Sequence, residues 1–247
     1  MESNLSVSSV ISVSNISKIF KTYDSKFVAL NDVSFDIKSN EFVIISGENG
    51  SGKSLLMSII AGLEKPTEGS VKTSSCIGLV FQDADAAILG DTPNDDIMFS
   101  LVNIGKKKKE AKEIANDILK RINLYEKKDS PSHSLSGGEK RRLAIGSILA
   151  LGFKIIIMDE PYSNLDYSGV KDVNKLIMSL LNDGVTIVLL THEIEKCLGK
   201  SDRLIIMQKG EVKYNGIPSG ILGKPLAEWG IKNPLSSYTN ISDLFWE

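Results

Sequence analysis

The feature that most constrains this chain is a glycine-rich stretch that fits the phosphate-binding pattern G-x-x-x-x-G-K-[ST]. The stretch reads Gly47, Glu48, Asn49, Gly50, Ser51, Gly52, Lys53 and Ser54. The apolar run at 42–45 before it indicates a buried strand, and the run at 55–61 after it predicts a helix that ends at Gly62. Strand, glycine loop and helix are the context that this motif requires, which disfavours a glycine turn that binds nothing.

The residue types in this stretch suit a phosphate group. Glycines let the backbone turn tightly and bring N–H groups onto phosphate oxygens, and the start of a helix adds partial positive charge. The predicted binding set therefore continues from the glycine loop into Leu55 at the start of the helix. Lys53 is expected to reach the β- and γ-phosphates of a nucleotide, and the hydroxyl of Ser54 to bind Mg²⁺.

Size and composition limit the number of domains, the class of partner and the location that the chain can have. The chain has 247 residues, 42% of them hydrophobic, which predicts one large domain or one domain with a small lobe. A net charge of −2 argues against a nucleic-acid partner. Cys76 and Cys197 lie far apart, so reduced thiols are expected. The Ser-rich start, 1–15, lacks the basic residues of a signal peptide. The longest nearly apolar run, 143–153, falls short of the roughly 20 residues of a membrane span. Any membrane role is expected to come through a partner.

The N-terminal part of the chain predicts an antiparallel sheet. Apolar and polar residues alternate at 10–19 and 28–37, as in half-exposed strands. Between these segments stand Phe20 and Tyr23, either of which offers a ring that can stack on adenine. From position alone, an ordinary sheet aromatic is the better interpretation. A turn is predicted at 65–69 and a strand at 77–81, which ends at Gln82.

The middle of the chain predicts a helical lobe inserted into an α/β domain. A loop is expected at 83–96, helices are expected over 94–104 and 107–124, and a third helix starts near Gly137 and runs to about Leu151. The run Lys106–Lys109 is interleaved with Glu110 and Glu113, which indicates a solvated helix face rather than a patch for lipid or nucleic acid.

The last third alternates strands and helices. Strands are predicted at 155–158, 185–190 and 203–207, helices at 169–181 and 193–199, and a hairpin near 208–214. This alternation predicts a parallel sheet with helices on both faces. The predicted organisation is a nucleotide-binding α/β core with an antiparallel β subdomain (8–93 and 152–216), a helical subdomain (94–151) and a C-terminal extension of short helices and loops (217–247).

Asp159 and Glu160 end the buried strand at 155–158. Parallel sheets place ligands at the carboxyl ends of their strands. Four apolar residues followed by an aspartate fit the pattern whose carboxylate helps to hold Mg²⁺, and a second carboxylate beside it suits the orientation of an attacking water. Without the phosphate-binding loop, two ordinary strand-end carboxylates would be the better interpretation.

A second helix start follows Leu135. Ser136 and Glu139 fit the capping box S-x-x-E. A cap does not require the two glycines, Gly137 and Gly138, each of which costs about 1 kcal/mol relative to alanine in a helix. Bare N–H groups at a helix start suit an anion that approaches the backbone closely. One nucleotide that touches both helix starts would most simply be shared between two copies of the chain.

Two further polar residues end predicted strands. His192 follows the strand at 185–190 and is placed to hydrogen-bond a γ-phosphate, and Gln82 is placed to reach a metal ion or a water. His133 lies in a Ser/Pro loop and is interpreted as a surface residue.

Taken together, these stretches resemble the nucleotide-binding domain of ABC transporters over residues 8–216. The matching stretches are Walker A (47–54), the Q-loop glutamine (Gln82), the signature motif (135–139), Walker B (155–160), the D-loop (163–166) and the switch histidine (His192). The resemblance implies a RecA-like P-loop fold and hydrolysis of Mg-ATP, in which Glu160 polarises the attacking water. It also implies that Lys53, Ser54, Gln82, Asp159 and His192 surround Mg-ATP, and that Ser136, Gly137 and Gly138 complete the site of the opposite protomer. Phe20 aligns best with the adenine-stacking aromatic of the family, and Tyr23 stays an alternative.

The stretch from Val80 to Gly105 is similar to the ATPases of energy-coupling factor importers. That resemblance implies a homo- or heterodimer on the cytoplasmic side of the cell membrane, attached to a transmembrane coupling protein and a substrate-binding membrane subunit, for uptake of a vitamin or a transition-metal ion. Ala84, Glu139 and the stretch 161–164 depart from the common pattern without removing a catalytic group.

Three other functions fit the sequence less well. A soluble ABC-type ATPase of translation or DNA repair is disfavoured. Translation factors of this type carry two such domains in one chain, and repair ATPases carry long coiled-coil insertions. The sequence shows neither feature. A switch GTPase would need an N-K-x-D motif, which the sequence lacks. A non-catalytic subunit is disfavoured because every catalytic group is present.

Overall fold

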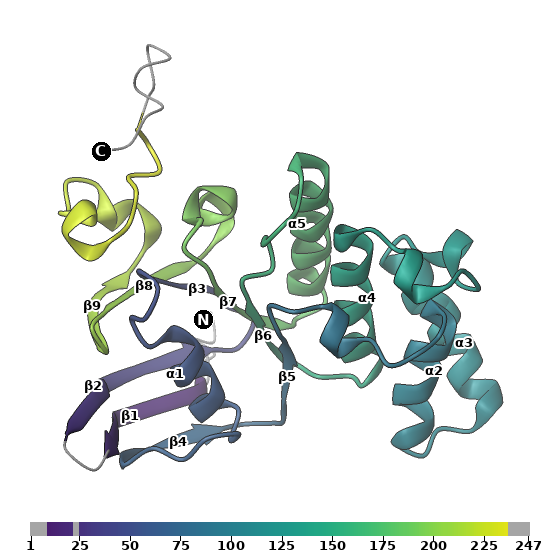
Figure 1. The fold of residues 1–247 in the computed structure, drawn as a ribbon, viewed down its shortest axis with the longest axis horizontal. Helices are drawn as coiled ribbons and strands as arrows, with labels where there is room; N and C mark the ends of the chain where they lie inside the picture. The colour runs from purple at the N-terminus through teal and green to yellow at the C-terminus, as the bar shows by residue number, and fades with distance from the viewer. Residues whose placement is uncertain (1–8, 22–24, 237–247) are drawn as a thin grey trace, which may run out of the picture.

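The computed structural model describes residues 9–21 and 25–236, which form two β-sheets flanked by helices (Figure 1). The larger sheet has the strand order β5-β6-β7-β3-β8-β9. Its strands are β3 (Phe42–Ser46), β5 (Ile77–Val80), β6 (Ile155–Asp159), β7 (Thr186–Leu190), β8 (Arg203–Gln208) and β9 (Glu211–Gly216). All neighbours pair in parallel except β8 and β9, which form an antiparallel hairpin. The predicted, mostly parallel α/β fold is confirmed.

The sequences of the central strands are continuously apolar, and the burial of these strands explains why. Every residue of β3, β6 and β7 is buried, because the sheet is covered on both faces. One face packs against α5 (Tyr167–Asn182) and the other against α1 (Lys53–Ile60). Alternate residues of one strand serve the two sides: Ile44 belongs to the cluster with α5, and Ile45 to the cluster with α1.

The smaller sheet is antiparallel and has the order β2-β1-β4. It consists of β1 (Ser9–Lys21), β2 (Lys26–Lys38) and β4 (Glu68–Thr73), and it covers α1 from the side away from the large sheet. The two long strands were predicted and β4 was not. Only Val71 of β4 is partly buried, so this edge strand carries almost no apolar alternation by which a sequence reveals a strand.

Three helices gather at the end of the molecule farthest from β9 (Figure 1). They are α2 (Pro93–Asn103), α3 (Lys108–Arg121) and α4 (Gly137–Ala150), joined by the 3₁₀ turns η2 (Tyr125–Lys127) and η3 (Ser132–Ser134). Lys106 pairs with Glu110 at 2.6 Å, in agreement with the solvated face expected there. The division of the chain into core, helical subdomain and extension stays a prediction.

Two parts of the chain differ from the expectation. Residues 193–199 do not form a helix but two 3₁₀ turns, η4 (Ile194–Lys196) and η5 (Leu198–Lys200). The backbone N–H of Glu193 is held by the Thr191 hydroxyl at 3.0 Å, so the segment starts in a turn and not in a helix. The loop predicted at 83–96 contains η1 (Asp85–Ala87), which was not expected. The helix predicted at 94–104 is present as α2, and the Thr92 hydroxyl caps its start by accepting from the Asp95 N–H.

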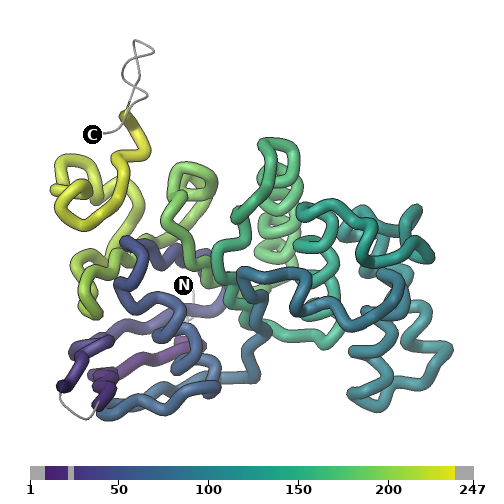
Figure 2. The backbone as a smooth tube through the Cα atoms, in the orientation of Figure 1, coloured from purple at the N-terminus to yellow at the C-terminus, as the bar shows by residue number. Residues whose placement is uncertain are grey.

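The described part of the C-terminal extension, 217–236, runs back beside β8 and β9 as compact turns (Figure 2). It contains the short 3₁₀ helices η6 (Pro218–Ile221) and η7 (Leu226–Trp229), in agreement with the short helices and loops expected for the tail. Cys76 is exposed, Cys197 is buried, and both are free thiols. Among the described residues, no helix is long and apolar enough to cross a membrane.

Candidate functional site

The phosphate-binding loop connects the carboxyl end of β3 to α1, and its backbone path requires glycine. Gly47 has φ 149°, and a Cβ there would lie 2.1 Å from the carbonyl oxygen of Met207 in β8. Gly52 has φ 101°, and a Cβ there would meet Leu30 of β2 at 2.7 Å. The loop is therefore wedged between the two sheets, where a side chain at either position would push it out of place.

The start of α1 is open to an anion. Its N-cap, Gly52, supplies no side-chain acceptor, so the first N–H groups of the helix, at Lys53, Ser54 and Leu55, have neither a helical partner nor a cap. The helices α2, α4 and α5 are capped by the side chains of Thr92, Ser136 and Asp166, whereas α3, like α1, has no side-chain cap. The buried hydroxyl of Ser51 also lacks a partner. These donors and orphaned groups fit a phosphate at the start of α1.

The Lys53 ammonium lies inside the loop. It donates to the carbonyl oxygens of Gly47 at 2.7 Å and Glu48 at 3.0 Å, and only 7% of the residue is exposed. Burial lowers the pKa of Lys53, and the nearby carboxylates of Glu160 and Asp159 act in the opposite direction. A bound phosphate would supply the negative charge that the buried ammonium favours.

Asp159 and Glu160 stand where β6 ends, opposite the loop. Burial and the adjacent charge of Glu160 raise the pKa of Asp159, while a hydrogen bond from Ser54 acts to lower it. A buried carboxylate beside a hydroxyl is a donor set that suits a hard cation such as Mg²⁺. Glu160 has a left-handed φ of 44°, an uncommon backbone conformation for a residue with a side chain.

The Glu160 carboxylate is held on both oxygens by the residues that follow β7. The hydroxyl of Thr191 donates to Oε2 at 3.0 Å, and the backbone N–H of His192 donates to Oε1 at 3.2 Å. The His192 ring nitrogen Nδ1 lies 2.9 Å from the same Oε1. Glu160 is buried, whereas 53% of the His192 side chain is exposed, so the histidine lies at the mouth of the site.

A cavity of about 690 Å³, named the P-loop cavity below, joins these groups. Its lining residues are Phe20, Phe27, Ala29, Asn49, Gly50, Gly52, Lys53, Ser54, Leu55, Gln82, Asp159, Glu160 and His192. Eleven of the predicted site residues therefore meet in one cavity, while Gly47, Glu48 and Ser51 lie in the loop outside its lining.

Phe27 and Ala29 were not predicted, because nothing in the sequence distinguishes them from other β2 residues. Phe27 pairs with Phe20 across β1 and β2, and both rings are exposed at the cavity mouth. The pair offers a flat aromatic surface next to the phosphate loop. Tyr23, the alternative adenine-stacking residue, lies outside the described residues.

The signature residues do not join this cavity. The capping box at Ser136 is formed: its hydroxyl accepts from the Glu139 N–H at 3.3 Å, and the Glu139 carboxylate accepts from the Ser136 N–H at 2.9 Å. Gly137 lines a separate cavity of about 390 Å³, and Gln82 lines both. Within one copy of the chain, Ser136, Gly137 and Gly138 thus stand apart from the phosphate loop.

Arg141, which the sequence analysis missed, ties α4 to the end of β5. Its guanidinium donates to the carbonyl oxygens of Phe81 and Gln82, both at 2.6 Å, and only 3% of the residue is exposed. Burial lowers its pKa, and Asp83 and Asp159 oppose that shift. The sequence signal for Arg141 was its position, as a basic residue two positions after the signature motif.

The profile of the family described as "ABC transporter" matches residues 30–163. The chain belongs to this family. It is an ABC ATPase, which binds ATP and hydrolyses it. Among curated proteins, it is 39% identical to the energy-coupling factor transporter ATP-binding protein EcfA1 of Fusobacterium nucleatum, over 85% of this chain and 83% of that protein. It is 34% identical to EcfA1 of Clostridioides difficile, over 96% of this chain and 91% of that protein.

Solved structures of ABC ATPases have the same fold. CbiO1 from Clostridium perfringens, described as part of the ABC transporter complex cbiONQ, superposes with a TM-score of 0.80 at 30% identity, over 87% of this chain and 91% of that one. The dimeric cassette MJ0796, bound to ADP and Pi in a post-hydrolysis state, gives a TM-score of 0.75 at 29% identity, over 84% of this chain and 98% of that one. The resemblance to the energy-coupling factor ATPases, stated above from the sequence, is confirmed.

Proposed function

We propose that this ABC ATPase powers an energy-coupling factor importer. It acts as a peripheral protein on the cytoplasmic side of the cell membrane, bound to a transmembrane coupling protein and a substrate-binding membrane subunit. The imported substrate is a vitamin or a transition-metal ion. The names of the EcfA1 relatives and of the CbiO1 complex support this assignment.

ATP binds in the P-loop cavity with its phosphates on the start of α1. The backbone from Gly47 to Leu55 surrounds the phosphates, and Lys53 faces the β- and γ-phosphates. Phe20, with Phe27 beside it, provides the surface on which adenine stacks. The uncapped N–H groups of α1 and the orphaned Ser51 hydroxyl support this placement.

The oxygen atoms of Ser54, Gln82 and Asp159 form the site for Mg²⁺. A hydroxyl, an amide and a carboxylate are oxygen donors of the kind that this ion takes. Mg²⁺ bound there neutralises charge on the β- and γ-phosphates. Ser54 and Asp159 line the same cavity, and the Ser54 side chain acts to lower the pKa of Asp159, which supports one ion shared between them.

Glu160 is the base that polarises the attacking water, and this assignment rests on one observation above all. Thr191 and the His192 backbone fix the carboxylate at the carboxyl end of β6, facing the phosphate loop. Because both oxygens are held, the carboxylate is already oriented before a water arrives. His192 reaches from the same position toward the γ-phosphate, and Gln82 contacts the water or the metal ion.

Two copies, or this chain and a related partner chain, share each nucleotide. Ser136, Gly137 and Gly138 of one protomer close over the γ-phosphate held by Lys53 of the other. The separation of these residues from the P-loop cavity within one copy supports this arrangement, as does the dimeric MJ0796 cassette.

The loop around residues 82–99 carries the motion of this closure to the membrane partner. The core (8–93 and 152–216) holds the nucleotide, the helical subdomain (94–151) carries the signature residues, and the extension (217–247) follows the core in sequence. Apolar side chains remain exposed along the loop and helix between residues 81 and 99. They include Phe81, Leu89 and Phe99, with exposed fractions of 45%, 70% and 50%. This surface fits an apolar segment of the coupling protein.

The test is purification of the tagged full-length chain from detergent-solubilised native membranes. We expect it to bring along a protein with several membrane spans and a small membrane protein. The double variant Leu89→Glu, Phe99→Glu should lose both partners, whereas Leu63→Glu, at an exposed leucine in another region, should keep them. Recovery in the ribosomal or nucleoid fraction, without membrane proteins, would instead support a soluble ABC-type ATPase of translation or DNA repair.

A further inference from the structure

The C-terminal extension contacts the phosphate loop at a glycine. Gly230 follows the 3₁₀ helix η7 and has a left-handed φ of 70°. A Cβ on Gly230 would lie 2.7 Å from the Cβ of Glu48 and 3.0 Å from its Oε2. Because the Cβ of Glu48 is bonded to its backbone, no rotamer of Glu48 would relieve that overlap. A side chain at position 230 would therefore have to displace the phosphate loop or the extension.

Glu48 takes part in the hydrogen bonds that hold the phosphate loop. Its carbonyl oxygen accepts from the Lys53 ammonium at 3.0 Å and from the Ser51 N–H at 3.2 Å. Lys53 is the residue proposed to face the phosphates, and the buried Ser51 hydroxyl is one of the groups that fit a phosphate. A displacement of Glu48 would thus be passed on to both residues.

The turn that carries this glycine is anchored in the core on both sides. Leu226 before it and Ile231 after it are 5% and 3% exposed, and both belong to the core cluster that contains β8. The Gln208 side chain, at the end of β8, donates to the carbonyl oxygen of Glu228. Because the turn cannot move without breaking these contacts, a side chain in place of the glycine is expected to displace Glu48.

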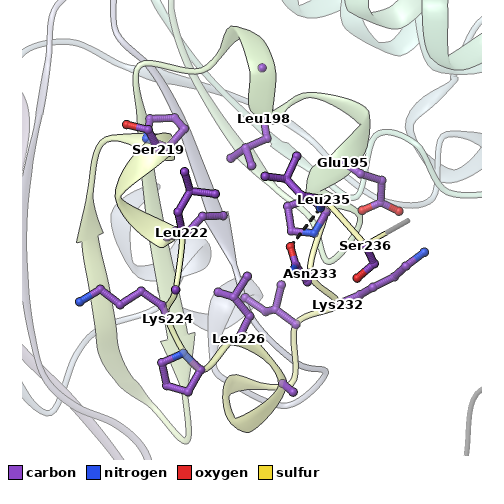
Figure 3. Close-up of a pocket in the computed structure, with 18 residues that line it drawn as sticks. Glu195, Leu198, Ser219, Leu222, Lys224, Leu226, Lys232, Asn233, Leu235 and Ser236 are labelled. Atoms are coloured by element: carbon purple, nitrogen blue, oxygen red, sulfur yellow. Dashed lines mark hydrogen bonds between the residues drawn. The ribbon is translucent and has the colours of Figure 1, made fainter. Parts of the chain in front are cut away.

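The rest of the extension folds around a cavity that this contact does not involve. The cavity has a volume of about 810 Å³, and Leu198, Leu222 and Leu226 are among its lining residues (Figure 3). Gly223 also lines the cavity, whereas Gly230 does not. Gly223 therefore offers a comparison within the same extension.

We propose that the C-terminal extension positions the phosphate loop for nucleotide binding through the contact of Gly230 with Glu48. This inference rests on the proposed placement of the phosphates at the start of α1. Gly230 is then a positioning residue, which lies outside the lining of the P-loop cavity and acts on Lys53 through Glu48. Because coupling between two sites is reciprocal, the extension raises the affinity for ATP, and bound ATP stabilises the extension.

Gly230→Ala and Gly223→Ala form a matched pair in the full-length chain. Gly223 also has a left-handed φ, 75°, but within the described part of the chain a Cβ there would meet no atom within 4 Å beyond its chain neighbours. Both substitutions impose similar backbone strain, so both should lower the unfolding midpoint by a similar amount. Only Gly230→Ala displaces Glu48, so it alone should weaken ATP binding, by about tenfold in an equilibrium titration. Equal ATP affinity in the two variants would overturn the proposal.

A double-mutant cycle tests whether the effect passes through Glu48. Glu48→Gly removes the Cβ that an alanine at position 230 would meet. In the Glu48→Gly chain, Gly230→Ala should therefore change ATP affinity by no more than about twofold. The same large loss of affinity in this background would contradict the proposal, since the effect would then not depend on Glu48.

Lys53→Ala separates this inference from the proposed function. If the phosphates lie on the loop, Lys53→Ala should lose ATP binding. Unchanged affinity in Lys53→Ala would mean that the proposed placement of the phosphates is wrong. Lost affinity in Lys53→Ala, together with wild-type affinity in Gly230→Ala, would mean that the placement is right and that the extension does not support the loop.

Hydrogen exchange on the wild-type chain gives a readout that a purely structural contact would not change. The Gly230 N–H is hydrogen-bonded within the turn, to the carbonyl oxygen of Ala227 at 3.0 Å. Saturating ADP should slow exchange in the stretch 226–231 several-fold and leave the stretch 218–223 unchanged. Exchange in 226–231 that does not respond to ADP would overturn the proposal, even if Gly230→Ala fails to fold.

Discussion

At the scale of single residues, the site holds ionisable groups in an environment that disfavours their charged forms. The sheet buries Asp159, and the charge of Glu160 next to it adds to the shift, so the pKa of Asp159 is raised. Burial likewise lowers the pKa of Lys53. Before the nucleotide binds, each charge is thus less favourable than it would be in water. We expect this cost in stability to be offset when a phosphate and a cation bind.

The stability cost of the ionised Asp159 carboxylate predicts that Asp159→Asn stabilises the nucleotide-free protein while it abolishes magnesium-dependent hydrolysis. A carboxyl with a raised folded pKa costs stability when it is ionised, so the gain should be full above that folded pKa. The gain should shrink as the pH falls toward 3.8, the ordinary value, where the group is protonated in both states. At pH 7.5 we expect a midpoint higher by about 2–4 °C, the response of a chain this size to ~1 kcal/mol.

Thermal unfolding of the wild type and the variant at several pH values measures this effect. Asp129→Asn is the control, because Asp129 is exposed and its neutralisation should leave the midpoint unchanged. A lower midpoint for Asp159→Asn at pH 7.5 would mean that the ionised carboxylate stabilises the fold, contrary to this account.

At the scale of elements, α4 and the end of β5 act as one unit because Arg141 joins them. The two carbonyl oxygens that it holds belong to Phe81 and to Gln82, the residue that lines both cavities. A hydrogen bond from a charged donor to a buried acceptor contributes about 1.5–3 kcal/mol. Movement of the signature helix is therefore expected to carry Gln82 with it.

We predict that Arg141→Ala lowers kcat about tenfold, a loss of ~1.4 kcal/mol in transition-state stabilisation, and changes ATP affinity less than twofold. Arg141→Lys should restore kcat only in part, since an ammonium cannot hold two carbonyls in the geometry of the guanidinium fork. Steady-state kinetics with a separate binding measurement distinguishes the two effects.

Arg203→Ala is the matched control. Arg203 also binds a backbone carbonyl and a carboxylate, those of Asp36 and Glu41, but at the start of β8, away from the site. It should cost stability and leave kcat unchanged. An equal fall of kcat in both variants would show that Arg141 acts through general stability alone.

Elements also show how far the sequence predicts the structure. The buried strands and the glycine loop were predictable. Complete burial restricts a strand to apolar residues, and a tight backbone turn restricts a loop to glycine. The edge strand β4 was not, since its exposed surface imposes no pattern. Phe27 and Arg141 were missed for another reason: their roles depend on the partners Phe20, Phe81 and Gln82, which only the tertiary fold brings near them.

At the scale of the whole molecule, the proposed function divides each nucleotide site between two copies of the chain. Gly137 supports this division most directly, because, within the part of the chain that the structure describes, a Cβ there would have only the carbonyl oxygen of Asn164 nearby, at 3.8 Å. Within one copy, a side chain fits at Gly137 without a clash. A requirement for glycine there must therefore come from a group outside the chain.

This argument predicts complementation between two inactive variants. Lys53→Ala should not bind ATP productively, and Gly137→Glu should fold normally but block the nucleotide of its partner. Mixed in equal amounts and paired as homodimers at random, they should recover about a quarter of wild-type ATPase activity, because half of the dimers then contain one intact site. Gly137→Glu with full activity by itself would contradict a shared nucleotide.

The most direct test of the account is the hydrolysis of ATP by Glu160→Gln, because Glu160 is the group to which the proposed function assigns the activation of water. The variant retains the side-chain shape but not the charge, so it should bind ATP with unchanged affinity, accumulate as an ATP-bound dimer, and turn over roughly 10²–10⁴-fold more slowly. ATP binding and hydrolysis, measured on one preparation together with its size in solution, give all three quantities. Turnover equal to that of the wild type would contradict the account, since the water would then be activated by some other group.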